Sequence, residues 1–256
     1  SMTKPLISIL ALMTIERNRL SLRDPIKNYL PYFCKTEVET ITLLREKLTR
    51  PITILDLLTH TSGLSYGFNN DCHIGNQYRN NRLIHRSNVS LKKFVESVGD
   101  YPTAFQPGTK WQYSLATDVL AHILEIIHDD AIETILADLI LKPLRMKDTA
   151  YFVPKEKLWR LMPIYGEPDL DRVTDSRSKV KQLNEIDLEN FYSSNKKKYQ
   201  ARGGHGLFST TADYSTFCKV ILEDVIKNSK KLISKNLLTF ALKNQLPFSQ
   251  IPIQIN

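Results

Sequence analysis

The chain has 256 residues and a formal net charge of +8, from 35 basic and 27 acidic side chains. Its hydrophobic fraction of 42% and charged fraction of 24% are those of an ordinary globular protein, and no apolar run is long enough to cross a bilayer. The positive charge is spread along the chain, and its densest cluster, Lys196–Lys198, is typical of a solvated loop. The composition therefore requires no nucleic-acid partner.

Cysteine and histidine spacing gives no sign of a disulfide framework or a metal site. The three cysteines, Cys34, Cys72 and Cys218, are far apart and form no CxxC pair. The six histidines form no HExxH pattern. The run Asp71–His73 has side chains of the kinds that bind metal ions, but it lies in a loop, and no second group of such ligands accompanies it. We therefore expect neither a structural metal nor a cofactor.

The first residues bear on everything that follows. Translation starts at methionine, yet this chain begins with Ser1. Either upstream residues precede it, or Ser1 remains from a removed tag and Met2 is the native start. Both interpretations remove any signal peptide from view, so the sequence assigns no compartment. It assigns no oligomeric state either.

An almost uniformly apolar stretch over residues 3–17 predicts a buried helix. Pro5 fits only in a first turn, where the backbone N–H groups have no partner within the helix. The helix must therefore begin close to Ser1. A short second helix is expected over residues 24–30.

Further helices follow along the chain. Thr53 is suited to cap a helix over residues 54–59, which Ser62-Gly63 would close. Helical patterns also predict the segments 91–98, 115–127, 130–142, 212–224 and 235–243.

Strands are nearly absent from the predicted pattern. Tyr151–Val153 is one of few strand-like runs, whereas residues 65–90 and 166–200 are polar and predict long loops. So many apolar helices need a surface to pack on, and a sheet is the usual one. The fold of the chain therefore looks incomplete.

A hydroxyl and an amine lie three residues apart at the start of the first predicted helix. In Ser1-Met2-Thr3-Lys4 the serine and lysine side chains fall on one face of the helix, one turn apart. A serine becomes nucleophilic when a base takes its proton, and a lysine kept neutral by burial or by a neighbouring cation can be that base. The structural alternative is a capping serine followed by an exposed lysine. The apolar helix argues against it, because Lys4 would enter a core.

Four segments with distinctive residues follow one another along the chain: Ser1-Met2-Thr3-Lys4-Pro5, Ile52–Leu64 with its Leu-Thr-His-Thr-Ser-Gly run, Pro107–Leu115 with its Tyr-Ser-Leu run, and Gly203–Thr210. Together they resemble, in order and spacing, the signatures of the serine β-lactamase-like and penicillin-binding protein-like family, closest to its esterase branch. The resemblance covers nearly the whole chain. It implies a β-lactamase/transpeptidase-like fold.

The resemblance also implies a catalytic set of Ser1, Lys4 and Tyr113. Ser1 would attack the ester or lactam carbonyl and carry the acyl group, while Lys4 would help to deprotonate it. Tyr113 would share that proton and pass it to the leaving group. The structural alternative for Tyr113 is a buried aromatic residue that hydrogen-bonds through its hydroxyl.

Other residues in these segments refine the expectation. β-Lactamases of the related class carry Asn where this chain has Leu115, and a leucine cannot hydrogen-bond the amide side chain of a penicillin. Family esterases commonly have an apolar residue there, so Leu115 favours esters. We interpret His60 as a hydrogen-bonding scaffold residue. His205 lies between glycines near the expected wall of the site, where close backbone approach, rather than catalysis, is the expected role of the segment.

The family also carries a late strand with Lys-Thr-Gly, His-x-Gly or Trp-Gly-Gly, whose backbone N–H forms half of the oxyanion hole. No candidate for it occurs before Asn256. We therefore expect one α/β (α+β) domain over 1–256 that is incomplete at both termini, with the helical part largely present and the antiparallel sheet largely missing. Such a chain should be weakly stable or inactive by itself.

From the resemblance we predict a serine hydrolase that cleaves small-molecule esters through an acyl-enzyme on Ser1. One alternative is β-lactamase or D-alanyl peptidase activity. Another is a non-catalytic relative that binds an acyl or peptidoglycan ligand, which the absent late strand motivates. A third takes Ser1 as an N-terminal nucleophile that uses its own amine, but such residues generally start a strand. A basic nucleic-acid-binding module rests on net charge alone.

Overall fold

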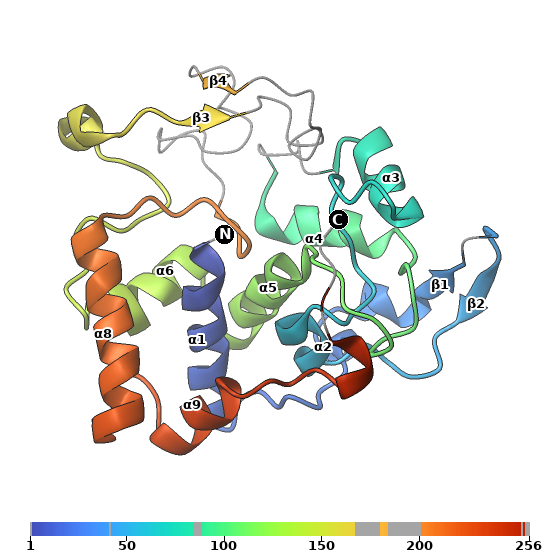
Figure 1. The fold of residues 1–256 in the computed structure, drawn as a ribbon, viewed down its shortest axis with the longest axis horizontal. Coiled ribbons are helices and arrows are strands. Elements are labelled where there is room, and N and C mark those ends of the chain that lie inside the picture. Colours follow the sequence, from blue (N-terminus) through green and yellow to red (C-terminus); the bar gives the residue numbers. More distant parts are fainter. Residues whose placement is uncertain are drawn as a thin grey trace.

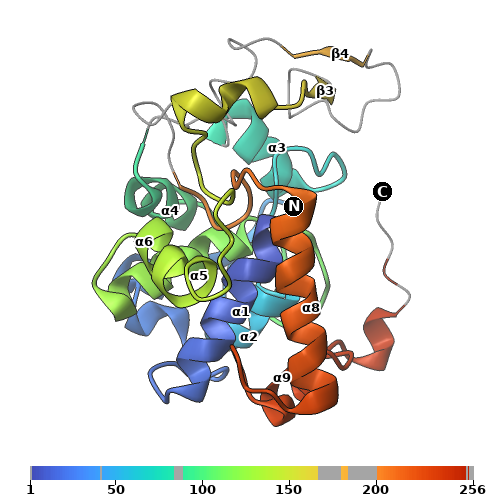
Figure 2. The ribbon, with the colours of Figure 1, turned by 90° about the vertical axis from the view of Figure 1, so that its left-hand side faces the viewer.

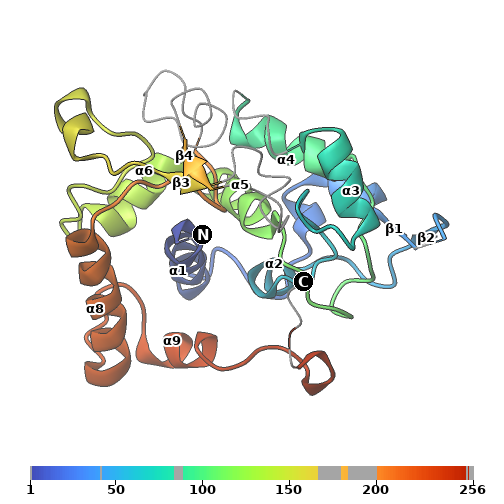
Figure 3. The same cartoon turned by 45° about the horizontal axis from the view of Figure 1, so that its top comes forward.

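A computed structural model describes residues 2–40, 42–83, 89–166, 180–183, 201–251 and 253. Its centre is the helix α1 (Thr3–Glu16), and Figure 3, which looks almost along this helix, shows the other helices arranged round it. These helices are α2 (Ile54–Thr59), α3 (His73–Asn80), α4 (Leu91–Gly99), α5 (Ala116–His128), α6 (Ile132–Leu136), α8 (Thr211–Lys227) and α9 (Lys235–Ala241).

The central helix α1 is buried on most of its circumference, as the apolar sequence predicts. Leu6, Ile7 and Leu10 are at most 1% exposed, and the helix packs against α5 and α6. Pro5 lies in the first turn, where a proline costs no helical hydrogen bond. Just beyond the helix, Asn18 has a φ of +57°, a left-handed conformation that asparagine tolerates. The packing of α1 therefore fixes its first turn within the protein.

Two neighbouring helices hold α1 from opposite sides. On one side α5 packs on α1 and also on α2, α4 and α6 (Figure 1). On the other side α8 runs alongside α1 (Figure 2), and the Tyr214 hydroxyl of α8 donates a hydrogen bond to the Met2 carbonyl oxygen at 3.0 Å. No helix among the described residues has the length and apolar character needed to cross a bilayer.

The strands in the described part of the chain form two small antiparallel pairs. One joins β1 (Glu37–Glu39) to β2 (Arg45–Lys47), and the other joins β3 (Tyr165–Gly166) to β4 (Lys181–Gln182). Short 3-10 helices cover Ile26–Asn28, Pro31–Lys35, Lys155–Arg160 and Phe248–Gln250, and a π-helix over Ala137–Leu141 continues α6. The fold is thus helix-rich with small antiparallel sheets, consistent with the α/β class.

Two sequence predictions about local structure are wrong. Tyr151–Val153 is not a strand. Only an isolated bridge between Ala150 and Phe208 forms beside it, and the Tyr151 hydroxyl donates a hydrogen bond to the Arg202 carbonyl oxygen. The expected loop 65–90 contains α3, whose few apolar residues left a weak pattern.

The remaining differences are small. The second helix, expected over 24–30, is the single 3-10 turn Ile26–Asn28. Most of the predicted loop 166–200, with the lysine cluster 196–198, lies outside the described residues.

The burial of α1 predicts that its apolar side chains contribute more to stability than the exposed apolar side chains of other helices. Leu10→Ala should lower the free energy of unfolding by about 3 kcal/mol, because it leaves a cavity among residues that are already packed. Leu222→Ala on α8 is the matched control, since that leucine is 56% exposed and should cost less than about 0.5 kcal/mol. Urea unfolding of both variants measures the difference. Equal losses would contradict the central position of α1.

Candidate active site

Lys4 lies in the first turn of α1, and its amine points into the protein. The residue is 9% exposed. Its Nζ donates one hydrogen bond to the Gly204 carbonyl oxygen at 2.9 Å and another to the Tyr66 hydroxyl at 3.2 Å. The sequence predicted that Lys4 would enter a core, and this is where the side chain lies.

Two tyrosine rings flank the lysine nitrogen. The Nζ atom is 4.7 Å from the centroid of the Tyr113 ring and 5.5 Å from that of Tyr66. The centroids of the two rings are 5.2 Å apart. Ring faces carry a negative potential that attracts a cation. The structure thus brings Lys4 and Tyr113 together, whereas Ser1 lies outside the described residues.

The glycines before His205 permit a close backbone approach to α5. A Cβ atom on Gly203 would lie 2.1 Å from the Thr117 carbonyl oxygen, which no side chain tolerates. The Gly204 N–H donates a hydrogen bond to Oδ1 of Asp118 at 3.0 Å. The turn therefore holds the Gly204 carbonyl oxygen, which accepts the hydrogen bond from Lys4, in a fixed position, as glycine allows.

Two loops carry the tyrosines and are hydrogen-bonded to each other. The Gln112 N–H donates to the His60 carbonyl oxygen at 2.9 Å, and the Leu115 N–H donates to the Ser65 carbonyl oxygen at 3.2 Å. The Asn69 side-chain amide donates to the Tyr113 carbonyl oxygen at 2.9 Å. Tyr66 and Tyr113 are therefore positioned by two loops that are hydrogen-bonded to each other.

Both histidines of the site are held neutral. Burial, assisted by the positive charge of Lys4, lowers the pKa of His60 to about 4. Its Nδ1 hydrogen-bonds the Ser114 hydroxyl at 3.1 Å, which is the scaffold role expected from the sequence. Burial likewise lowers the pKa of His205 to about 4. At neutral pH neither imidazole adds positive charge beside Lys4.

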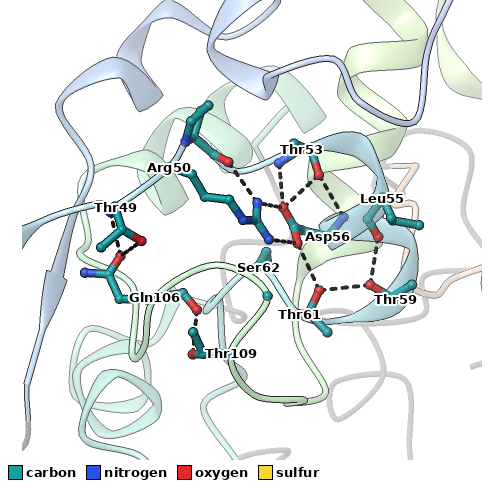
Figure 4. Close-up of polar contacts among 12 residues, drawn as sticks. Thr49, Arg50, Thr53, Leu55, Asp56, Thr59, Thr61, Ser62, Gln106 and Thr109 are labelled. Atoms are coloured by element: carbon teal, nitrogen blue, oxygen red, sulfur yellow. Dashed lines mark hydrogen bonds and ion pairs between the residues drawn. The ribbon is translucent and has the colours of Figure 1, made fainter. Parts of the chain in front are cut away.

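An ion pair at the start of α2 helps to anchor the two loops that carry Tyr66 and Tyr113 (Figure 4). Arg50 donates to both oxygens of Asp56, at 2.7 and 2.8 Å. Thr53 caps α2 and forms a capping box with Asp56, and the Thr61 hydroxyl also donates to this carboxylate. Burial acts to raise the pKa of Asp56, but the hydrogen bonds from Arg50 and Thr53 outweigh it and hold the pKa below its ordinary value.

A cavity of about 810 Å³ opens beside the first turn of α1. Met2 and Thr3 line one side of it, Tyr214 and Cys218 of α8 line another, and His205 closes an end. Among the described residues, no group of three histidine, cysteine or acidic side chains is arranged to hold a metal ion. The cavity gives room for a small molecule beside the first turn of α1, although Lys4 and Tyr113 are not among its lining residues.

Leu115 does not line the site. Its side chain is fully buried in the hydrophobic core, beside the start of α5. The position that carries Asn in related β-lactamases therefore offers no polar atom here.

Sequence reasoning missed two residues that contact Lys4 or its partner. Tyr66 follows directly after the Thr-Ser-Gly-Leu-Ser run, and Asp118 lies five residues after Tyr113. Tyr66 has no local signal, because it meets Lys4 only through the folding of a distant segment. The one cue for Asp118 was an acidic residue in the first turn of a helix rich in apolar residues.

Comparison with known proteins identifies the family. The family model described as Beta-lactamase matches residues 1–245. Among curated relatives, Protein Rv1367c of Mycobacterium tuberculosis is 31% identical over 238 residues, which is 91% of this chain and 55% of that protein. Esterase EstB of Burkholderia gladioli is 29% identical over 180 residues, covering 68% of this chain and 43% of the esterase. The chain thus spans about half the length of the curated relatives it matches.

Solved structures show the same fold. Simvastatin synthase (LovD) from Aspergillus terreus superposes with a TM-score of 0.75 at 21% identity, over 98% of this chain and 58% of that one. EstCE1, described as a hydrolase with promiscuous acyltransferase activity, gives a TM-score of 0.72 at 20% identity, over 93% and 60% of the two chains. The helical arrangement round α1 is therefore that of β-lactamase/transpeptidase-like proteins.

The Arg50–Asp56 pair predicts a pH-dependent contribution to stability. Because the folded pKa of Asp56 lies below its unfolded value of about 4, the stabilisation is complete above that pH and is lost as the pH falls through the folded value. Asp56→Asn should lower the free energy of unfolding by about 2 kcal/mol at pH 7. The deficit should shrink at pH 3.

Urea unfolding at the two pH values measures this deficit. Asp138→Asn is the matched control, since its pair with Lys142 is exposed on one helix face and contributes little. A deficit for Asp56→Asn that is the same at pH 7 and pH 3 would contradict the assigned role of the ion pair.

Proposed function

This chain belongs to the β-lactamase family, and on that premise we propose that it is a serine acyl hydrolase that cleaves small-molecule esters through an acyl-enzyme on Ser1. The observation that carries the proposal is the buried amine of Lys4, which lies three residues after Ser1 in the sequence, is held by Gly204 and Tyr66, and is close to the Tyr113 ring. A buried amine this close to a serine in the sequence is where a base for that serine is needed.

The proposed reaction has two halves. In the first, the Ser1 oxygen bonds to the ester carbonyl carbon while its proton passes to Lys4, assisted by Tyr113. The carbonyl carbon–alkoxy oxygen bond then breaks, and the leaving alcohol takes up the proton. In the second, a water molecule gives a proton to the same base and attacks the acyl-enzyme. The bond between the acyl carbon and the Ser1 oxygen then breaks, the base returns the proton to that oxygen, and the carboxylic acid leaves.

The helix itself contributes to this chemistry. The positive end of α1 lies at its N-terminal turn, where negative charge would develop on the Ser1 oxygen and on the carbonyl oxygen. His60 and His205 are neutral at pH 7, so no imidazolium adds charge beside Lys4.

Esters are favoured over β-lactams by one position in particular. Leu115 is buried in the core and supplies no amide to bind the side chain of a penicillin. Two curated relatives point in the same direction by name, namely esterase EstB and the lovastatin esterase of Penicillium rubens, which is 29% identical over 87% of this chain. We therefore propose small-molecule esters as substrates.

Turnover and covalent labelling test the proposal. The protein, expressed from its complete reading frame, should hydrolyse p-nitrophenyl butyrate and should be labelled by a fluorophosphonate on Ser1, located by peptide mass spectrometry. Hydrolysis of the chromogenic cephalosporin nitrocefin should be at least a hundredfold slower. No labelling and no turnover would remove the hydrolase. Faster turnover of nitrocefin would favour the β-lactamase alternative.

Substitution of the lysine tests its role as a base. Lys4→Met keeps an unbranched side chain in the buried position but removes the amine, so kcat should fall by about 10²–10⁴-fold. Lys27→Met is the matched control, because Lys27 is exposed on a turn remote from α1, and its activity should be unchanged. Circular dichroism of both variants establishes that each is folded. A folded Lys4→Met variant with full activity would contradict the role.

A further inference from the structure

Asp118 is a buried carboxylate that the proposed reaction does not use. It lies in the first turn of α5 and is 0% exposed. Its Oδ1 accepts the hydrogen bond from the Gly204 N–H, and its Oδ2 has no hydrogen-bond partner. Burial of a carboxylate costs several kcal/mol unless a neighbouring positive charge compensates for it. Its place in the fold therefore calls for a cation nearby.

Buried Arg202 is one such cation, and the Lys4 ammonium lies close by as a second. A Cβ atom on Gly204 would lie 2.7 Å from Asp118 Oδ2, 2.9 Å from the Tyr66 hydroxyl and 3.3 Å from Lys4 Nζ, so the three polar groups surround one point. Gly204 joins the two charges directly. Its N–H is bound by Asp118, and its carbonyl oxygen is bound by Lys4. Any other residue at this position would separate the carboxylate from the amine.

Other ionisable groups also act on Asp118. The buried Arg202 guanidinium interacts with it electrostatically, and also lies 4.6 Å from the centroid of the Phe94 ring and donates to the Val89 carbonyl oxygen. Tyr151 donates its hydroxyl proton to the Arg202 carbonyl oxygen, and its pKa is raised far above the ordinary value by burial and, to a smaller extent, by Asp118. His205 also interacts with Asp118 but is neutral at pH 7. Tyr66 and Tyr113 contact Lys4.

We propose that Asp118 is a positioning residue for the reaction: through the Gly204 peptide it fixes the acceptor of Lys4, and through its charge it sets the pH at which Lys4 changes between ammonium and amine. The inference rests on the proposed function. A carboxylate in the protein interior favours the ammonium form of a nearby lysine, so loss of its charge lets the amine form persist to lower pH. The geometry of Lys4 and the pH range of catalysis are then two consequences of one buried residue.

The pH dependence of p-nitrophenyl butyrate hydrolysis tests this inference. Asp118→Asn keeps the acceptor for the Gly204 N–H but removes the charge. On a plot of kcat against pH, the sloping part of the curve that depends on Lys4 (its limb) should move to lower pH by about one unit or more. KM should change less than twofold, because Asp118 is fully buried and bonds the Gly204 peptide rather than an open surface. A purely structural role for Asp118 would lower the yield of folded protein without moving the limb.

Asp224→Asn is the matched control. Asp224 is also 0% exposed and accepts backbone N–H groups, at Lys231 and Leu232, but it lies at the far end of α8. This variant should lose stability and keep the wild-type pH profile. A limb that moves equally in both variants would overturn the assignment to Asp118.

A second variant covers the case in which Asp118→Asn folds poorly. Gly204→Ala keeps the charge but inserts a methyl group between Asp118 Oδ2 and Lys4 Nζ, so the limb should move in the same direction. For both variants, the rate constant of fluorophosphonate labelling at each pH replaces turnover, because a rate constant does not depend on how much protein is folded.

The outcomes separate this inference from the function it rests on. A wild-type protein without turnover or labelling would overturn the proposed function and this inference with it. An active wild-type protein whose limb stays in place in Asp118→Asn and Gly204→Ala would overturn the role of Asp118 alone.

Discussion

The burial of the Lys4 nitrogen is the constraint on which the rest of the site depends. An amine in the interior must keep hydrogen-bond acceptors, because the loss of water is otherwise uncompensated. Its acceptors come from Tyr66 and Gly204, which lie 62 and 200 positions away in the sequence. The chain satisfies one side chain of α1 only by bringing two distant turns to its first turn. A site assembled in this way exists only when the helices round α1 are all folded.

The scaffold that brings those turns together is made of backbone contacts. The loop after α2 and the loop before α5 bond to each other through main-chain groups of His60, Gln112, Ser65 and Leu115. Gly63 allows them to approach, since a Cβ atom there would lie 2.5 Å from the Phe105 carbonyl oxygen at a φ of +85°. The capping box and the Arg50 pair hold the start of α2 in place. The tyrosines of the site are therefore positioned by the main chain more than by their own side chains.

Membership of the β-lactamase family gives this scaffold a chemical context. The helical layer matches the solved relatives over more than nine-tenths of the chain, although identity is near 20%. The details of the site in this chain are local. Leu115 lies in the core, two neutral histidines border the lysine, and a carboxylate lies beneath Gly204. These details, rather than the fold, bear on which carbonyl compound the site would accept.

The sequence by itself determined the elements whose signal is local. The apolar run with Pro5 located α1, Thr53 located the start of α2, and the four ordered segments identified the family and the pairing of Lys4 with Tyr113. Only the tertiary structure decided the contacts that join distant segments. Tyr66 and Asp118 reach the site because loops and glycines close on α1, and neither residue belongs to a periodic pattern or a short motif. Hydrophobic periodicity is a property of neighbours in the chain, whereas the partners of a buried amine are set by packing.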